Sequence, residues 1–215
     1  MRITKLGHAC VRLEHGGTTV VVDPGSFTAP GATDGADLVL VTHEHPDHWT
    51  AEHLAATDAP VRTVQAVADA IRAQDAAVAD RVIVVTPGEV LDPAEVGLPV
   101  TAVGEWHNVI HRELPRVHNT GYLVTLGETV VYHPGDALTV PGVPVDVLLA
   151  PASAPWLRSE MAIDFVRQVG APVNVAIHDA IYSEAGHTVL AAQMGQLLPQ
   201  AQTWVRLAEG ADLPM

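Results

Sequence analysis

Cysteine and long hydrophobic segments are both scarce in this sequence. The single cysteine, Cys10, cannot form a disulfide within the chain, which is typical of a protein from a reducing compartment. No apolar run is long enough to cross a bilayer, and residues 1–8 contain no apolar segment of the kind found in signal peptides. We therefore expect a cytoplasmic protein that has no membrane partner.

Positive charge is scarce as well. Lys and Arg total 11 against 25 Asp and Glu, which gives a formal net charge of −14, and Lys5 is the only lysine. No cluster of basic residues interrupts this excess of negative charge, so the surface would repel a phosphate backbone. The composition therefore argues against nucleic acid as a partner, and it leaves homo-oligomerisation open.

The hydrophobic content is sufficient for a sizeable core. Hydrophobic residues make up 48% of the 215 residues, and they are spread evenly along the chain. No low-complexity tract or linker divides the sequence into two parts. We expect one domain that covers residues 1–215.

A group of residues that commonly bind metals directly follows an apolar segment. Residues 38–41 are rich in branched side chains and predict a buried strand, after which come His43, His45, Asp47 and His48. In a tight turn, this spacing lets several side chains converge on one point. Imidazole and carboxylate groups suit Zn²⁺, Mn²⁺ or Fe²⁺. A solvated His-rich loop is the alternative reading, but the residue types and their position after a strand favour a metal site.

The remaining sequence predicts a mixed α/β fold. Strands are expected over residues 3–6, 10–14, 18–22, 38–41, 61–64, 82–85, 90–95, 99–106, 121–126, 129–133, 145–149, 173–177 and 203–207, and helices over residues 50–56, 66–79, 159–169 (with a Ser cap) and 186–198. His43, His107, Asp136 and His178 each lie just beyond an expected strand. Loops that leave strand ends commonly form sites at one edge of a sheet, so these four loops could meet there.

The run from His43 to His48 resembles the His-x-His-x-Asp-His signature of the metallo-β-lactamase-fold hydrolases. That resemblance implies a four-layer αββα sandwich and a dinuclear site, in which His43 and His45 bind one metal and Asp47 and His48 bind the other. Residues 6–10 and 21–24 resemble the opening of a narrower group, the compact ascorbate-6-phosphate-lactonase-like branch.

The same resemblance implies three further ligands. His107 corresponds to the third histidine of the first metal site, although His111 and His118 lie in the same loop and compete for that role. Asp136 follows Gly135 after an expected hairpin and would bridge both metals. The family often has Thr after this Gly-Asp pair, whereas this chain has Ala at position 137, so a hydrogen bond that supports a ligand is in doubt. His178 corresponds to the last ligand of the second site.

The resemblance to the narrower branch also implies that His8 and Asp23 lie near the site, where they would support a ligand or contact substrate. Asp23 could orient a ligand imidazole. A structural histidine and an ordinary turn are the alternatives for these two residues.

The resemblance implies a hydrolase that uses two divalent metal ions to activate water for attack on a small-molecule ester, lactone or phosphodiester. Zn is preferred over Mn or Fe, and Asp47 and Asp136 are the expected catalytic carboxylates. Alternatives are a phosphodiesterase or nuclease of the same fold and a non-catalytic metal-binding protein. A di-iron redox enzyme is disfavoured because such branches resemble His-x-Glu-x-Asp, and His45 departs from that pattern.

Overall fold

The computed structural model describes residues 1–214 and contains two β-sheets. In spatial order, the first sheet consists of β1 (Arg2–Gly7), β2 (Cys10–His15), β3 (Thr18–Val22), β4 (Leu38–Leu40), β5 (Val61–Thr63) and β6 (Val82–Val84). The second sheet runs through β13 (Thr203–Val205), β12 (Val173–Ile177), β11 (Val147–Pro151), β10 (Thr129–His133), β9 (Gly121–Leu126), β8 (Val100–Val103) and β7 (Val90–Leu91). In each sheet, antiparallel hairpins on one side adjoin parallel strands on the other.

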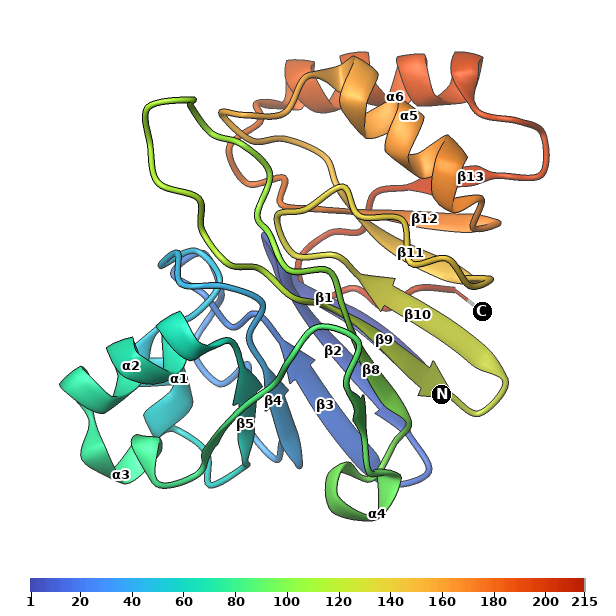
Figure 1. Ribbon diagram of the computed structural model, residues 1–215. Helices are drawn as coiled ribbons and strands as arrows, with labels where there is room; N and C mark the ends of the chain where they lie inside the picture. Colours follow the sequence, from blue (N-terminus) through green and yellow to red (C-terminus); the bar gives the residue numbers. More distant parts are fainter. Residues whose placement is uncertain (215) are drawn as a thin grey trace.

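Helices cover the outer faces of both sheets. α1 (Ala51–Ala55), α2 (Gln65–Gln74) and α3 (Ala76–Ala79) lie beside the first sheet, whereas α5 (Ser159–Val169) and α6 (Glu184–Leu197) lie on the second; α4 (Pro93–Val96) is a short turn of helix (Figure 1). The largest buried cluster, between the sheets, includes Leu13, Leu40, Val124 and Ile177. Separate clusters lie under α2 and under α5 and α6. The predicted αββα sandwich is confirmed.

Strand β12 illustrates why the sheets are covered on both faces. Val175 and Ile177 belong to the cluster between the sheets, and Ala176 belongs to the cluster under α5 and α6. Successive side chains of a strand point to opposite faces, so a strand that is apolar throughout needs a partner layer on each side.

Some expected boundaries are wrong. The helix over residues 66–79 is broken at Asp75, which is extended and accepts hydrogen bonds from Ala77 N and Val78 N at the start of α3. The strand over residues 90–95 stops at Leu91, because Asp92 caps α4 and Pro93 begins it. The strand over residues 99–106 ends at Val103, where Gly104 adopts a φ of +80°.

The Ser cap expected at position 159 is also wrong. Ser159 is the first residue of α5, and Arg158 occupies the cap position without a side-chain hydrogen bond. Within residues 1–214, no helix has the length and apolar character needed to cross a membrane.

Candidate metal centre

The structure brings histidine and aspartate side chains from separate loops together. Three groups of ligand atoms each lie within 4.8 Å of one another. They are His43, His45, His107 and Asp136; His48, Asp136 and His178; and His8, Asp47 and His178. All seven residues that the sequence suggests as metal ligands belong to these groups, and the loops that carry them follow β4, β8, β10 and β12.

The first group contains His107 rather than its two competitors. His107 Nε2 lies 3.3 Å from Asp136 Oδ2, and its ring lies 4.9 Å from the ring of His43. His118 instead stacks on Trp106, and His111 is exposed in the loop. Of the three histidines, His107 alone is therefore placed to act with His43.

Asp136 lies between the first two groups. Its Oδ1 is 3.2 Å from His48 Nε2, and its Oδ2 is 3.1 Å from His178 Nε2 and 3.3 Å from His107 Nε2. The carboxylate is almost fully buried, and Asp136 N donates a hydrogen bond to Asn119 Oδ1 at 2.9 Å. One carboxylate thus faces imidazoles of both groups.

Asp23 contacts the ring nitrogen of His48, Nδ1, that faces away from Asp136. Its carboxylate accepts hydrogen bonds from Thr42 N and Thr42 Oγ1, each at 2.8 Å, and from His48 Nδ1 at 2.7 Å. Burial lowers the pKa of His48, but Asp136 and Asp23 raise it well above its ordinary value, so Nε2, which faces Asp136, must give up its proton to bind a metal ion. Asp23 therefore makes the contact expected of a residue that orients a ligand imidazole.

His133 is directed away from the cluster. Its Nε2 donates to the carbonyl oxygen of Ala9 at 2.8 Å, and its Nδ1 accepts a hydrogen bond from Gly135 N at 3.1 Å. Both ring nitrogens are thus occupied by backbone groups, and His133 acts as a neighbour of the site.

The environment favours groups that bind cations. Burial lowers the pKa of His43 well below its ordinary value, so this imidazole is neutral. Burial alone would raise the pKa of Asp136, but the charges of His48 and His178 hold it well below its usual range. For His178, burial lowers the pKa and Asp136 raises it, to about 9 overall. The negative field that retains this proton also attracts a divalent cation, for which the ligand must give the proton up.

The ligand atoms in the cluster are poorly satisfied by the protein itself. Among residues 1–214, His48 Nε2, His107 Nε2, His178 Nε2 and Asp136 Oδ1 are buried and make no hydrogen bond of good geometry, although the three imidazoles lie 3.1–3.3 Å from the Asp136 carboxylate. Leaving such groups without a partner costs about 1–3 kcal/mol each. Several orphaned nitrogens and a carboxylate oxygen around one point fit the coordination of divalent metal ions.

Some supporting residues have no signal in the sequence. Asn119, which holds Asp136, and Ser153, whose carbonyl oxygen accepts from His178 Nδ1 at 2.5 Å, lie 17 and 25 residues from their partners. Neither belongs to a pattern of metal-binding residues, so only the folded chain identifies them.

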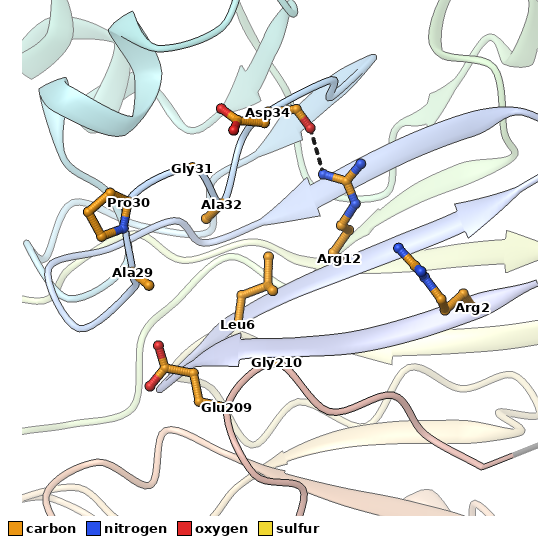
Figure 2. Close-up of a pocket in the computed structure, with 10 residues that line it drawn as sticks. All are labelled: Arg2, Leu6, Arg12, Ala29, Pro30, Gly31, Ala32, Asp34, Glu209 and Gly210. Carbon is orange, nitrogen blue, oxygen red and sulfur yellow. Dashed lines mark hydrogen bonds between the residues drawn. The ribbon is translucent and has the colours of Figure 1, made fainter.

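One large hollow lies away from the cluster. It measures about 620 Å³ and is lined by Leu6, Arg12 and Pro30 among others, on the outer face of β1 and β2 (Figure 2). Arg12 Nη1 already donates to the carbonyl oxygen of Asp34 at 2.8 Å. No candidate metal ligand lines this hollow, so it is not the metal centre. The metal centre is located by the groups of converging ligand atoms.

Comparison with known proteins shows the family to which the chain belongs. Residues 2–178 match the family described as the beta-lactamase superfamily domain. The chain is 40% identical over 185 residues to protein Rv0786c of Mycobacterium tuberculosis, covering 84% of this chain and 85% of that protein. It is 32% identical over 197 residues to UPF0173 protein PF0020 of Pyrococcus furiosus, covering 86% of each.

A solved structure shows the same fold. The metallo hydrolase Igni18 of Ignicoccus hospitalis superposes with a TM-score of 0.75 at 18% identity, covering 99% of this chain and 97% of that one. Membership of the ascorbate-6-phosphate-lactonase-like branch stays a prediction. On the family match and the two relatives, the chain belongs to the beta-lactamase superfamily and is related to the UPF0173 proteins, several of which are named metal-dependent hydrolases.

Proposed function

We propose that this protein is a metal-dependent hydrolase that uses a dinuclear divalent-metal centre to activate water for attack on a small-molecule ester, lactone or phosphodiester. The observation that carries the proposal is the position of Asp136 between two groups of imidazoles. The family membership and the names of the relatives support the hydrolase assignment.

The ligands divide between two sites. His43, His45 and His107 would hold the first ion; Asp47, His48 and His178 would hold the second; and Asp136 would bridge them. When bound, such ions lower the pKa of water and polarise the substrate oxygen that they contact. Zn²⁺ is preferred because imidazole ligands predominate.

The two carboxylates would act differently. Asp136 is 3% exposed in its side chain, so its role is to hold and neutralise the ions. Asp47 is 24% exposed and lies 3.3 Å from His178, so it can exchange protons with solvent at the edge of the site. We propose Asp47 as the group that carries a proton to the departing oxygen.

Charge and ligand content separate this proposal from its alternatives. The net charge of −14 disfavours nucleic acid as substrate. A non-catalytic relative would be expected to lack a ligand residue, whereas all seven candidates belong to ligand groups. The proposal includes a cytoplasmic location, for which the single cysteine is the argument.

Metal content per chain provides the first test. We expect about two divalent ions in the wild type and about one after His178→Ala. His118→Ala changes a histidine in an exposed loop and is the control, which should retain the wild-type metal content. A screen with lactones, carboxylic esters and phosphodiesters then compares the same three proteins. Absence of metal from the wild type, or full metal content in His178→Ala, would contradict the proposal.

A further inference from the structure

His8 is placed like a metal ligand but differs from the others in its hydrogen bonds. It lies between β1 and β2, and its side chain is fully buried. Its Nε2 lies 3.4 Å from Asp47 Oδ2, and its ring lies 4.0 Å from the ring of His178. By distance alone, His8 could replace His48 in the second metal site.

The other ring nitrogen of His8 decides where its proton lies. Ala180 N donates a hydrogen bond to His8 Nδ1 at 3.1 Å, so Nδ1 carries a lone pair and no proton. A neutral imidazole has one N–H, which must then be on Nε2. A nitrogen that carries a proton has no lone pair for a metal ion, so the tautomer excludes Nε2 of His8 from coordination.

Three of the candidate ligand histidines have the opposite arrangement. Nδ1 of His107 faces the carbonyl oxygen of Asn108, and Nδ1 of His178 faces the carbonyl oxygen of Ser153, each at 2.5 Å. His48 Nδ1 faces Asp23. An oxygen acceptor at Nδ1 fixes one proton there, so the nitrogen that gives up its proton to bind a metal ion is Nε2.

The Nε2–H group of His8 therefore points into the centre, where the nearest protein acceptor is Asp47 Oδ2 at 3.4 Å. Nε2 is buried and has no hydrogen-bond partner in the part of the chain that the structure describes. We propose that His8 is not a metal ligand, and that its Nε2–H donates a hydrogen bond to the substrate oxygen on which negative charge develops during hydrolysis. The donor role rests on the proposed function, whereas the exclusion from the metal site rests on the hydrogen bond from Ala180.

The backbone around His8 supports a fixed donor. His8 has a φ of +39°, and its carbonyl oxygen accepts a hydrogen bond from His178 N at 2.9 Å. Its ring contacts Phe27 at 4.9 Å between centroids. A donor that is positioned before substrate arrives needs no reorganisation in the transition state, and such donors contribute most when they face developing negative charge.

The tautomer can be measured directly in the metal-loaded wild type. Long-range ¹H–¹⁵N correlation spectra of ¹⁵N-histidine-labelled protein distinguish a protonated from an unprotonated ring nitrogen, and His8→Gln assigns the His8 signals. We expect an unprotonated Nδ1 and a protonated Nε2. A protonated Nδ1 with a bare Nε2 would overturn the proposal, and this result does not depend on any substrate.

Two variants then separate a ligand from a donor. His8→Phe removes the donor and keeps a ring, whereas His8→Gln keeps an N–H donor. We expect both to retain the wild-type metal content, and we expect kcat to fall about 10²-fold in His8→Phe with partial recovery in His8→Gln. Loss of one ion, as in His178→Ala, would overturn the exclusion of His8 from the metal site, and an unchanged kcat in His8→Phe would overturn its donor role. If the wild type hydrolyses none of the screened substrates, the proposed reaction fails, while the tautomer and metal content still decide whether His8 is a ligand.

Discussion

Lys5 and Asp179 form an ion pair at 2.5 Å, in which the two side chains are only 5% and 7% exposed. Lys5 is the only lysine in the chain, and it lies on β1, the edge strand of the first sheet. Asp179 directly follows His178 in the loop after β12 of the second sheet. The pair therefore ties the first sheet to the loop that carries a candidate metal ligand.

Lys5→Met should destabilise the protein strongly. It removes the close counterion of the buried Asp179 carboxylate and leaves only Arg206, whose Nε is 4.0 Å away. Breaking a buried pair costs up to about 3–5 kcal/mol. Urea denaturation measures the change in the free energy of unfolding. Arg72→Met is the control, since it breaks an exposed pair with Asp69 and should change stability by less than about 1 kcal/mol.

The double variant Lys5→Met/Asp179→Leu tests the reason for that loss. Removing both charges also removes the buried carboxylate that has lost its close partner, so most of the lost stability should return. If the double variant is less stable than Lys5→Met, the loss of stability in Lys5→Met comes from the missing attraction between the two side chains and not from the buried Asp179 charge that remains.

Asp23→Asn should weaken metal binding without unfolding the protein. Asp23 has a φ of +51°, which Asn tolerates well, but the amide cannot accept from His48 with the strength of a carboxylate. Loss of such a supporting contact typically weakens metal affinity about 10–100-fold. Competition with a chromogenic chelator measures the affinity. Asp37→Asn, which affects a carboxylate that accepts from Thr19 N, should leave the affinity unchanged.

Gly135→Ala should disturb the position of Asp136. A Cβ at Gly135 would lie 2.4 Å from Asn119 Oδ1 and 2.7 Å from Thr42 Cβ, so the backbone before Asp136 must move. Gly142→Ala has a similar φ, +73° against +61°, but its Cβ would meet no described atom within 4 Å.

The two glycine variants therefore separate clash from backbone strain. Gly142→Ala should lose about 1–2 kcal/mol of stability from the left-handed backbone alone. Gly135→Ala should lose more than this and should also bind less metal. Equal losses of stability and equal metal contents in thermal unfolding and elemental analysis would show that the clash at Gly135 is relieved without moving Asp136.

Removal of metal should lower the melting temperature. A ligand that binds only the folded state at 1,000 times its Kd contributes about 4.1 kcal/mol. Calorimetry before and after treatment with a chelator measures the shift, and addition of Zn²⁺ should reverse it. The same melting temperature with and without chelator would contradict metal binding at the buried cluster.

Cys10 should be unreactive in the folded protein. It is fully buried, and burial raises the pKa of its thiol far above the ordinary value, so the reactive thiolate is absent. An aromatic disulfide reagent should label Cys10 only after addition of denaturant. Rapid labelling of the native protein would show that the start of β2 opens readily.

Local sequence patterns were enough to predict a mixed α/β fold and the candidate ligands between His43 and His48, whereas the sandwich and the roles of His107, Asp136 and His178 came from the resemblance to the metallo-β-lactamase-fold hydrolases. A run of branched apolar residues predicts a strand. The turn that follows such a run, β4, contains His43, His45, Asp47 and His48. Their spacing is a local property, so it can be read without knowing the fold. The break at Asp75 was missed because the helical periodicity of the apolar residues continues through it.

The choice among competing residues depended on contacts between distant segments. His107, His111 and His118 share one loop, and only the path of that loop against β10 places His107 beside Asp136. The role of His8 depends on Ala180 N, which is 172 residues away, and Lys5 meets Asp179 across a similar separation. The sequence by itself determined which residue types follow each strand. Tertiary structure decided which ring nitrogen faces the centre, because a tautomer is set by its hydrogen-bond partner and that partner comes from another part of the chain.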